Sequence, residues 1–226
     1  MSLTDIISRF PDDMVFGVAT SSYQIEGTAY GGCGPSHWDS FARRPGAISD
    51  GSDGAAACDH YHRYEEDLDL VAGGGFGAYR FSFSWPRLLP SSNSEVNAEG
   101  LAFYDRLLDA MLERDLQPFA TLYHWDLPQR HADAGGWQNR DVTGWFADYT
   151  DLVIRHFGDR LASVAPVNEP WCVSFLSHYW GHHAPGLCDL AATARSMHHV
   201  QLAHGRSIEV MRGHGQANLG CVLNKE

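Results

Sequence analysis

The sequence predicts an α/β fold in which helices cover a parallel sheet: a TIM-type (β/α) barrel, of which this chain holds the first four βα units plus strand five. Apolar segments of strand length alternate strictly with segments of helical periodicity, which is typical of parallel sheets. Polar and aromatic residues follow the strands at their carboxyl ends, where such barrels carry their active sites. These residues are Gln24, Trp85, His124, Trp125, Asn168 and Glu169.

A doubly wound open sheet is the alternative fold. It is disfavoured because neither GxGxxG nor GxxxxGK[ST] follows the first predicted strand. The glycine-rich run 73–77 precedes a strand instead of opening a helix, so it does not predict a phosphate-binding loop. We interpret it as a helix stop.

The composition is typical of an acidic globular protein. The chain has 226 residues, of which 16 are basic and 28 acidic, giving a formal net charge of −12. This charge argues against nucleic acid and anionic membranes as partners. Hydrophobic residues make up 44% of the chain, which suffices for a core, and the length fits one large domain or two small ones. Seven tryptophans offer flat apolar faces for packing or for stacking on sugars.

The cysteines and the N-terminus predict a cytoplasmic location. The five cysteines are odd in number and form no CxxC pair, so we expect reduced thiols. Residues 1–11 contain no long apolar run and include Asp5, which is unlike a signal peptide. No stretch approaches the roughly 18 apolar residues that span a membrane.

The first third of the chain predicts a strand, a long loop and a helix. Residues 14–19 form a short apolar run that predicts a buried strand, and residues 20–27 predict a loop. Residues 31–35 and 45–54 are rich in Gly, Pro, Ser and Asp, so we expect one long loop with a functional role. Residues 59–72 have helical spacing.

The remaining elements follow from the same patterns. Residues 78–85 alternate as a strand does, and Pro86 closes that strand. In the helix 142–157 the residues expected to face inward include Trp145, Phe146 and His156. The further strands are 118–123, the run that ends at Glu169, and 219–224, and the further helices are 98–113 and 190–211.

The Asn168–Glu169 dipeptide is the strongest candidate for chemistry. An apolar run leads into it, and Pro170 disfavours a helical conformation for Glu169, so the carboxylate should lie where a buried strand ends. A poorly solvated carboxyl group there tends to stay protonated, as a general acid must. The alternative is a strand-end glutamate that caps the following helix.

The histidine pairs favour packing over metal binding. His60 with His62 and His182 with His183 lack acidic or cysteine partners at a convincing spacing. We therefore predict no metal site and no cofactor. The pair His198–His199 lies on a predicted helix and is expected to pack there.

Five segments of the chain are distinctive when taken together: FGVATSSYQIEG (16–27), YRFS with SWPR (79–82 and 84–87), TLYHWDLP (121–128), VNEPW (167–171) and HAPG (183–186). They resemble the N-terminal half of glycoside hydrolase family 1, the β-glucosidase family. They recur in family order from near residue 15 to the end of the chain.

The resemblance implies a retaining β-glycosidase on an eightfold barrel, which acts through two carboxyl groups. Glu169 matches the acid/base, and Asn168 matches the residue that binds the sugar 2-hydroxyl. Gln24 and His124 match partners of the 3- and 4-hydroxyls, and Trp125 lies near that sugar in the family. Arg80 matches the cation beneath the nucleophile. Cys172 falls where the family lines the entrance to the site.

The second carboxylate of the family has no counterpart here. The family's nucleophile is a glutamate in a Thr-Glu-Asn-Gly motif after strand seven, and this chain has no such motif. We therefore expect residues 1–226 to be the N-terminal half of a single barrel domain, with little or no activity alone. Its open sheet edges should pair with a complementary C-terminal half or with a second copy. Arg80, without a nucleophile, should be solvated, re-paired or displaced.

Substrate identity stays open at this point. The resemblance favours a β-glucoside or a small oligosaccharide, with β-galactosides and 6-phospho-β-glucosides as alternatives. A non-catalytic sugar-binding or assembly half-barrel is the alternative to an enzyme.

Overall fold

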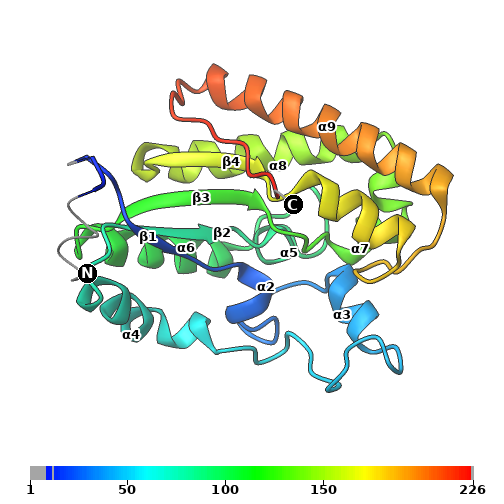
Figure 1. Cartoon of the computed structure of the whole chain (residues 1–226), viewed down its shortest axis with the longest axis horizontal. Coiled ribbons are helices and arrows are strands. Elements are labelled where there is room, and N and C mark those ends of the chain that lie inside the picture. The colour runs from blue at the N-terminus through cyan, green and yellow to red at the C-terminus, as the bar shows by residue number, and fades with distance from the viewer. Residues whose placement is uncertain (1–8, 12, 225–226) are drawn as a thin grey trace.

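The computed structural model describes residues 9–11 and 13–224, and its centre is a four-stranded parallel sheet (Figure 1). The strands pair in chain order without a reversal, which confirms the predicted parallel α/β class and disagrees with a doubly wound order. They are β1 (Gly17–Ala19), β2 (Ala78–Ser82), β3 (Gln117–Tyr123) and β4 (Ser163–Val167).

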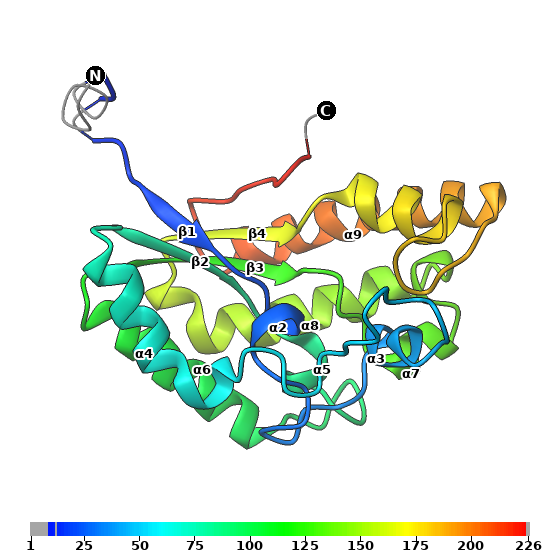
Figure 2. The ribbon, with the colours of Figure 1, turned by 60° about the horizontal axis from the view of Figure 1, so that its bottom comes forward.

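The long helices connect successive strands, as in βα units. Figure 2 shows α4, α6 and α8 gathered on one face of the sheet. The core lies between this face and the helices, where Phe83 packs 4.8 Å from Tyr104 and 5.1 Å from Phe157, measured between ring centroids. The long helices are α4 (His60–Gly73), α6 (Ala98–Leu112), α8 (Val142–Phe157) and α9 (Leu190–Gly213).

Most of the short helices lie in the segments that follow the strands, and η2 lies between α8 and β4. Two of them differ from the prediction: α2 interrupts the predicted loop 20–27, and α3 separates the stretches 31–35 and 45–54 of the predicted long loop. The Ser36 hydroxyl and the Asp39 carboxylate form a capping box, so a local signal starts α3 inside a loop-like composition. The short elements are α2 (Ser22–Ile25), α3 (His37–Ala42), α5 (Trp85–Leu88), α7 (Gln129–Asp133), η1 (Gly136–Gln138), η2 (Gly158–Arg160) and the π-helix η3 (Cys172–Tyr179).

Trp85 does not lie at a strand end, contrary to the sequence prediction. Strand β2 ends at Ser82, and Trp85 begins α5 with Pro86 in the first turn, where a missing N–H costs nothing. The Trp85 side chain is fully buried and stacks on Tyr149, with 4.9 Å between ring centroids. Trp85 is therefore a core residue and not a site residue.

The predicted strand 219–224 is present only as two isolated parallel bridges. Leu219 pairs with Val164 and Val222 pairs with Asn168, so the segment follows β4 without forming a continuous ladder. Figure 1 shows this C-terminal segment running beside β4. The prediction of inward-facing residues in 142–157 is wrong at one position, because the His156 side chain is exposed.

Among the helices of the described chain, none combines the length and the apolar character that crossing a bilayer requires.

Candidate active site

The candidate site forms where β3 and β4 end side by side. Tyr123 pairs with Val167 in the sheet, which places the next residue of each strand, His124 and Asn168, next to each other. The Asn168 backbone N–H donates to the Tyr123 carbonyl at 2.9 Å. The carboxyl ends of neighbouring parallel strands meet at one edge, so the sequence order alone brings these side chains together.

Arg80 on β2 fixes the orientation of the Asn168 amide. Its Nη2 donates to Asn168 Oδ1 at 2.7 Å, and its Nε donates to Thr121 Oγ1 at 3.0 Å. Arg80 is thus re-paired, as one of the sequence-based alternatives expects. Burial lowers the pKa of Arg80, and the nearby Glu169 carboxylate opposes this effect. Because Oδ1 accepts from Arg80, the Asn168 Nδ2 group points to His124.

His124 is held neutral with a defined tautomer. Its Nε2 lies 3.3 Å from Asn168 Nδ2, and since Nδ2 is a donor, Nε2 must accept. The proton is therefore on Nδ1, a buried atom without a hydrogen-bond partner among the described residues. Burial, with a smaller contribution from Arg80, lowers the pKa of His124 to about 4. A buried N–H without a partner is costly, so this ring position is unfavourable unless the surrounding contacts hold it.

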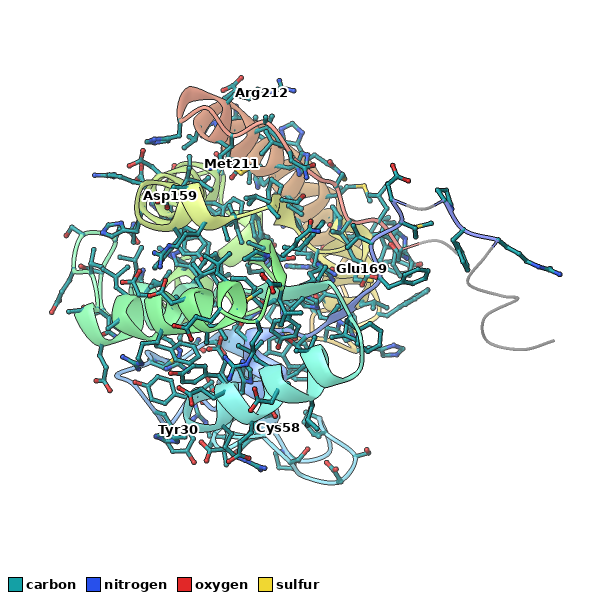
Figure 3. All side chains as sticks on the ribbon, turned by 90° about the vertical axis from the view of Figure 1, so that its left-hand side faces the viewer. Tyr30, Cys58, Asp159, Glu169, Met211 and Arg212 are labelled. Atoms are coloured by element: carbon teal, nitrogen blue, oxygen red, sulfur yellow. The ribbon has the colours of Figure 1, made fainter. Side chains whose placement is uncertain are left out.

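Glu169 follows β4 in a left-handed conformation. Its φ is 50°, uncommon for a residue with a side chain, and its backbone N–H donates to the Val222 carbonyl at 2.9 Å. Cys172 Sγ lies 3.5 Å from Glu169 Oε2. Glu169 is half-buried, and Figure 3 shows it on the side of the C-terminal segment. Backbone strain of this kind concentrates at functional sites.

Trp125 links β3 to β4 through its indole. Its Nε1 donates to the Asn168 carbonyl at 2.9 Å, and its φ of 82° is also left-handed. The sequence-predicted residues Arg80, His124, Trp125 and Asn168 therefore form one connected network, with Glu169 adjacent to Asn168 in the chain.

A pocket of about 290 Å³ opens beside this network. Gln24 lies on α2 and also lines the pocket, with an exposed side chain. Arg80, Asn168 and Glu169 do not line the pocket, and they connect to it through His124 and Trp125. Its lining combines aromatic rings with small and polar side chains: Ser21, Tyr23, Gln24, Trp38, Ala42, Ile48, Ser52, Asp53, Gly54, Ala57, His124, Trp125 and His183.

The model of the family described as glycosyl hydrolase family 1 matches residues 6–226. The chain belongs to glycosyl hydrolase family 1. It is 48% identical over 221 residues to a β-glucosidase of Agrobacterium sp., covering 97% of this chain and 48% of that protein. It is 44% identical over 207 residues to β-glucosidase A of Thermotoga maritima, covering 91% of this chain and 46% of that protein.

Solved structures agree with the family. The virulence factor SghA of Agrobacterium tumefaciens matches with a TM-score of 0.95 and 47% identity, over 98% of this chain and 50% of that one. The β-glucosidase of Thermotoga maritima in complex with glucoimidazole matches with a TM-score of 0.93 and 44% identity, over 96% of this chain and 50% of that one. This chain therefore spans about half the length of its family 1 relatives, which is consistent with a partial barrel.

Three aromatic side chains of the pocket had no predicted role in the site, and one of them, His183, was expected only to pack. Trp38 and His183 pack 5.4 Å apart between ring centroids, and His183 lies 4.9 Å from the Trp125 ring. Tyr23 lies 6.0 Å from Trp38. Two of these residues belong to segments that carry the family resemblance, Tyr23 in 16–27 and His183 in 183–186, so the signal was present without an assigned role.

Two other motif residues build the family 1 fold instead of the site. Arg87 Nε donates to Glu26 Oε2 at 2.9 Å, and both side chains are almost fully buried, with 1% and 4% exposed. The Tyr104 hydroxyl donates to the same carboxylate at 2.9 Å. This pair ties the loop after β1 to α5 and α6, which explains the glutamate in 16–27 and the arginine in 84–87.

The described part of the chain contains no group of three or more His, Cys, Asp or Glu side chains placed to hold a metal ion. His60 and His62 instead bind single carboxylates. His60 Nδ1 lies 2.6 Å from Asp67 Oδ2, and His62 Nδ1 lies 2.6 Å from Asp59 Oδ1.

Proposed function

We propose that this chain supplies the acid/base half of a retaining β-glucosidase that hydrolyses terminal β-linked glucose. The observation that carries the proposal is the network in which Arg80 orients Asn168 and Asn168 fixes the tautomer of His124. Two members of this network, His124 and Trp125, line the pocket, and Glu169 follows Asn168 directly in the chain. The β-glucosidase names of the relatives support the substrate class.

The chemistry follows from the two-carboxylate mechanism of retaining glycosidases. Glu169 protonates the leaving oxygen while a nucleophilic carboxylate from outside this chain attacks the anomeric carbon. Glu169 then takes a proton from the water that hydrolyses the glycosyl–enzyme intermediate. The sugar hydroxyls are bound by His124, Asn168 and Gln24, and Trp125 lies beside the sugar.

Arg80 supports the nucleophile in this proposal. Its guanidinium group lies among the carboxyl-end residues of β3 and β4, bonded to the neutral side chains of Thr121 and Asn168. It therefore still carries a full positive charge available to an incoming carboxylate. Without that second carboxylate, the chain alone should have little or no turnover.

The partner in this proposal is a complementary C-terminal half, or a second copy that pairs through the open sheet edges. The edge at β1 is flanked by exposed apolar side chains at Met14, Val15 and Phe16. Unpaired strand edges with apolar flanks pair readily with another chain. Nucleic acid, membranes and cofactors play no part in the proposal, and the cytoplasmic location stays a prediction.

Hydrolysis of an aryl β-glucoside tests the proposal. The assay uses this chain alone, and then mixed with a chain that carries barrel strands six to eight of a family 1 enzyme. We expect turnover only in the mixture, and loss of that turnover when this chain carries Glu169→Gln. An aryl β-galactoside and a 6-phosphorylated glucoside, assayed in parallel, test the alternative substrates.

Absence of turnover in both arms, with retained binding of glucose or glucoimidazole, would favour the sugar-binding half-barrel. Turnover by the chain alone in a monomeric state, as judged by light scattering, would contradict the assignment of the nucleophile to another chain.

A further inference from the structure

His37 is a buried histidine that the proposed chemistry does not use. It begins α3 and is 6% exposed, and its Nε2 lies 2.6 Å from the backbone carbonyl oxygen of Trp125. The two residues are 88 positions apart in the sequence. The contact therefore joins the loop after β1 to the end of β3.

The chemistry of this contact defines the state of His37. A carbonyl oxygen can only accept, so His37 Nε2 must carry a proton and donate. Burial lowers the pKa of His37 to about 4, so the ring is neutral near pH 7 with its single proton on Nε2. His37 is thus a fixed neutral donor and not a general base.

The acceptor belongs to a strained residue. Trp125 has a φ of 82°, a region that a bulky side chain enters only when its surroundings hold it there. A further contact, in which the His37 backbone N–H donates to the Leu127 carbonyl at 2.9 Å, fixes the chain just beyond Trp125. From this conformation the Trp125 indole reaches the Asn168 carbonyl at 2.9 Å.

We propose that His37 is a positioning residue for the sugar-binding site: by donating to the Trp125 carbonyl it holds Trp125 in the conformation from which the indole binds Asn168. The His37 side chain holds the backbone of Trp125, next to His124. The Trp125 indole in turn holds the backbone of Asn168, next to Glu169. The inference of a sugar site rests on the proposed function, but the positioning itself does not require turnover.

The test compares His37→Gln with His37→Met in the full chain. The two replacements are similar in length, but only glutamine has a terminal N–H that can donate to the Trp125 carbonyl. His131→Phe is the matched control, because His131 is also buried, at 3% exposed, and packs on Trp85 and Trp145 instead of Trp125.

The measured quantity is the indole N–H resonance of Trp125 in ¹H–¹⁵N NMR spectra, assigned with Trp125→Phe, together with its rate of exchange with solvent. In His37→Met we expect the resonance to move and to exchange about tenfold faster, as for the loss of one ordinary hydrogen bond. His37→Gln should keep the wild-type position and rate, and His131→Phe should leave both unchanged.

An unchanged Trp125 resonance in His37→Met would overturn the inference, as would an equal change in His37→Gln or in His131→Phe. If a variant does not fold, the pair is repeated in the presence of the stabilising osmolyte trimethylamine N-oxide. The same Trp125 resonance in His37→Gln and His37→Met under those conditions would also overturn the inference. Failure of the hydrolysis assay bears only on the proposed function, because the NMR comparison involves no catalysis.

Discussion

Arg80 and Asn168 are joined by a 2.7 Å hydrogen bond across 88 residues of sequence, and this bond decides which way the Asn168 amide faces. With the amide oxygen bound to Arg80, the amide nitrogen must point to His124 Nε2. The proton of the His124 ring is thereby placed on Nδ1. The Arg80 guanidinium group thus determines which atoms of Asn168 and His124 donate and which accept, and His124 lines the pocket.

Replacement of Arg80 by methionine should raise the pKa of His124. Burial is the larger cause of its low value of about 4, and the Arg80 charge is the second, so only the second is removed. We expect the pKa to move upward but to stay below the ordinary value of about 6.5. An NMR titration of the imidazole Cε1–H resonances measures it.

The control in that titration is His37. Burial is the largest cause of its pKa of about 4; the hydrogen bond to the Trp125 carbonyl raises the pKa, His178 and Arg44 lower it, and Arg80 is not among the causes. A His124 titration that is identical in Arg80→Met and wild type would show that Arg80 does not act on the ring.

Glu169→Gln should lower hydrolysis by the complemented chain by about 10²–10⁴-fold, the usual contribution of a general acid/base. The loss should be greater for an alkyl β-glucoside than for an aryl β-glucoside, because a good leaving group needs less protonation. Steady-state kinetics with both substrates measure the difference. Glu113→Gln, an exposed glutamate at the end of α6, is the control and should leave the rates unchanged. Equal losses for both substrates would contradict the acid role.

Arg87→Met should destabilise the chain by about 3–5 kcal/mol, because it leaves the Glu26 carboxylate buried without its cation. Urea unfolding followed by circular dichroism gives the free energy of unfolding. Arg63→Met removes an exposed pair with Glu66 and should change the midpoint little. If the two variants unfold at the same urea concentration, the buried pair does not support the fold.

The chain should lose stability as the pH falls from about 6.5 to 4. Burial lowers the pKa of His37, His124 and His131, to about 4, 4 and 3, so the folded state holds these rings neutral. The unfolded chain binds their protons below pH 6.5, and proton uptake on unfolding makes stability fall with falling pH. Urea midpoints at several pH values measure this dependence.

His131→Phe is the matched variant for the pH series, because a phenyl ring can keep the 4.4 Å stack on Trp145 without binding a proton. Its stability should depend less on pH between 6.5 and 4. Asp126 has the opposite effect on the pH dependence, because burial raises its pKa to about 7. Between pH 7 and 4 the folded state therefore binds a proton that the unfolded chain does not, and this carboxyl group stabilises the fold as the pH falls. Asp126→Asn should therefore make the stability fall more steeply with falling pH. A shallower fall in that variant would contradict the opposing effect of Asp126.

The isolated chain should self-associate through its open sheet. The exposed Met14, Val15 and Phe16 side chains flank the edge of β1, which pairs with no other strand among the described residues. A lysine at an exposed edge position opposes strand addition, so Val15→Lys should shift the distribution toward monomer. Light scattering over a range of concentrations measures the mass. A wild-type chain that stays monomeric at every concentration would rule out this interface.

The sequence by itself determined the elements and the position of the candidate acid/base. Helical periodicity placed α8 at 142–157, and the apolar run before Asn168 placed β4 and the strand end. These signals are local: periodicity, a proline or a glycine acts within a few residues. The motifs also placed His124, Trp125 and Asn168 at the carboxyl ends of adjacent strands, because parallel strands meet at one edge in chain order.

Only the tertiary structure decided what these side chains touch. The sequence predicts Trp85 at a strand end, but Trp85 begins α5 and its side chain packs on Tyr149 in the core. The prediction is wrong because local alternation does not reveal where a strand stops and a short helix begins. Asn168 lies 88 residues from Arg80, and Trp125 lies 88 residues from His37. The amide orientation, the histidine tautomers and the strained Trp125 conformation therefore depend on packing between distant segments. Hydrogen-bond partners at such separations leave no periodic or local mark in the sequence.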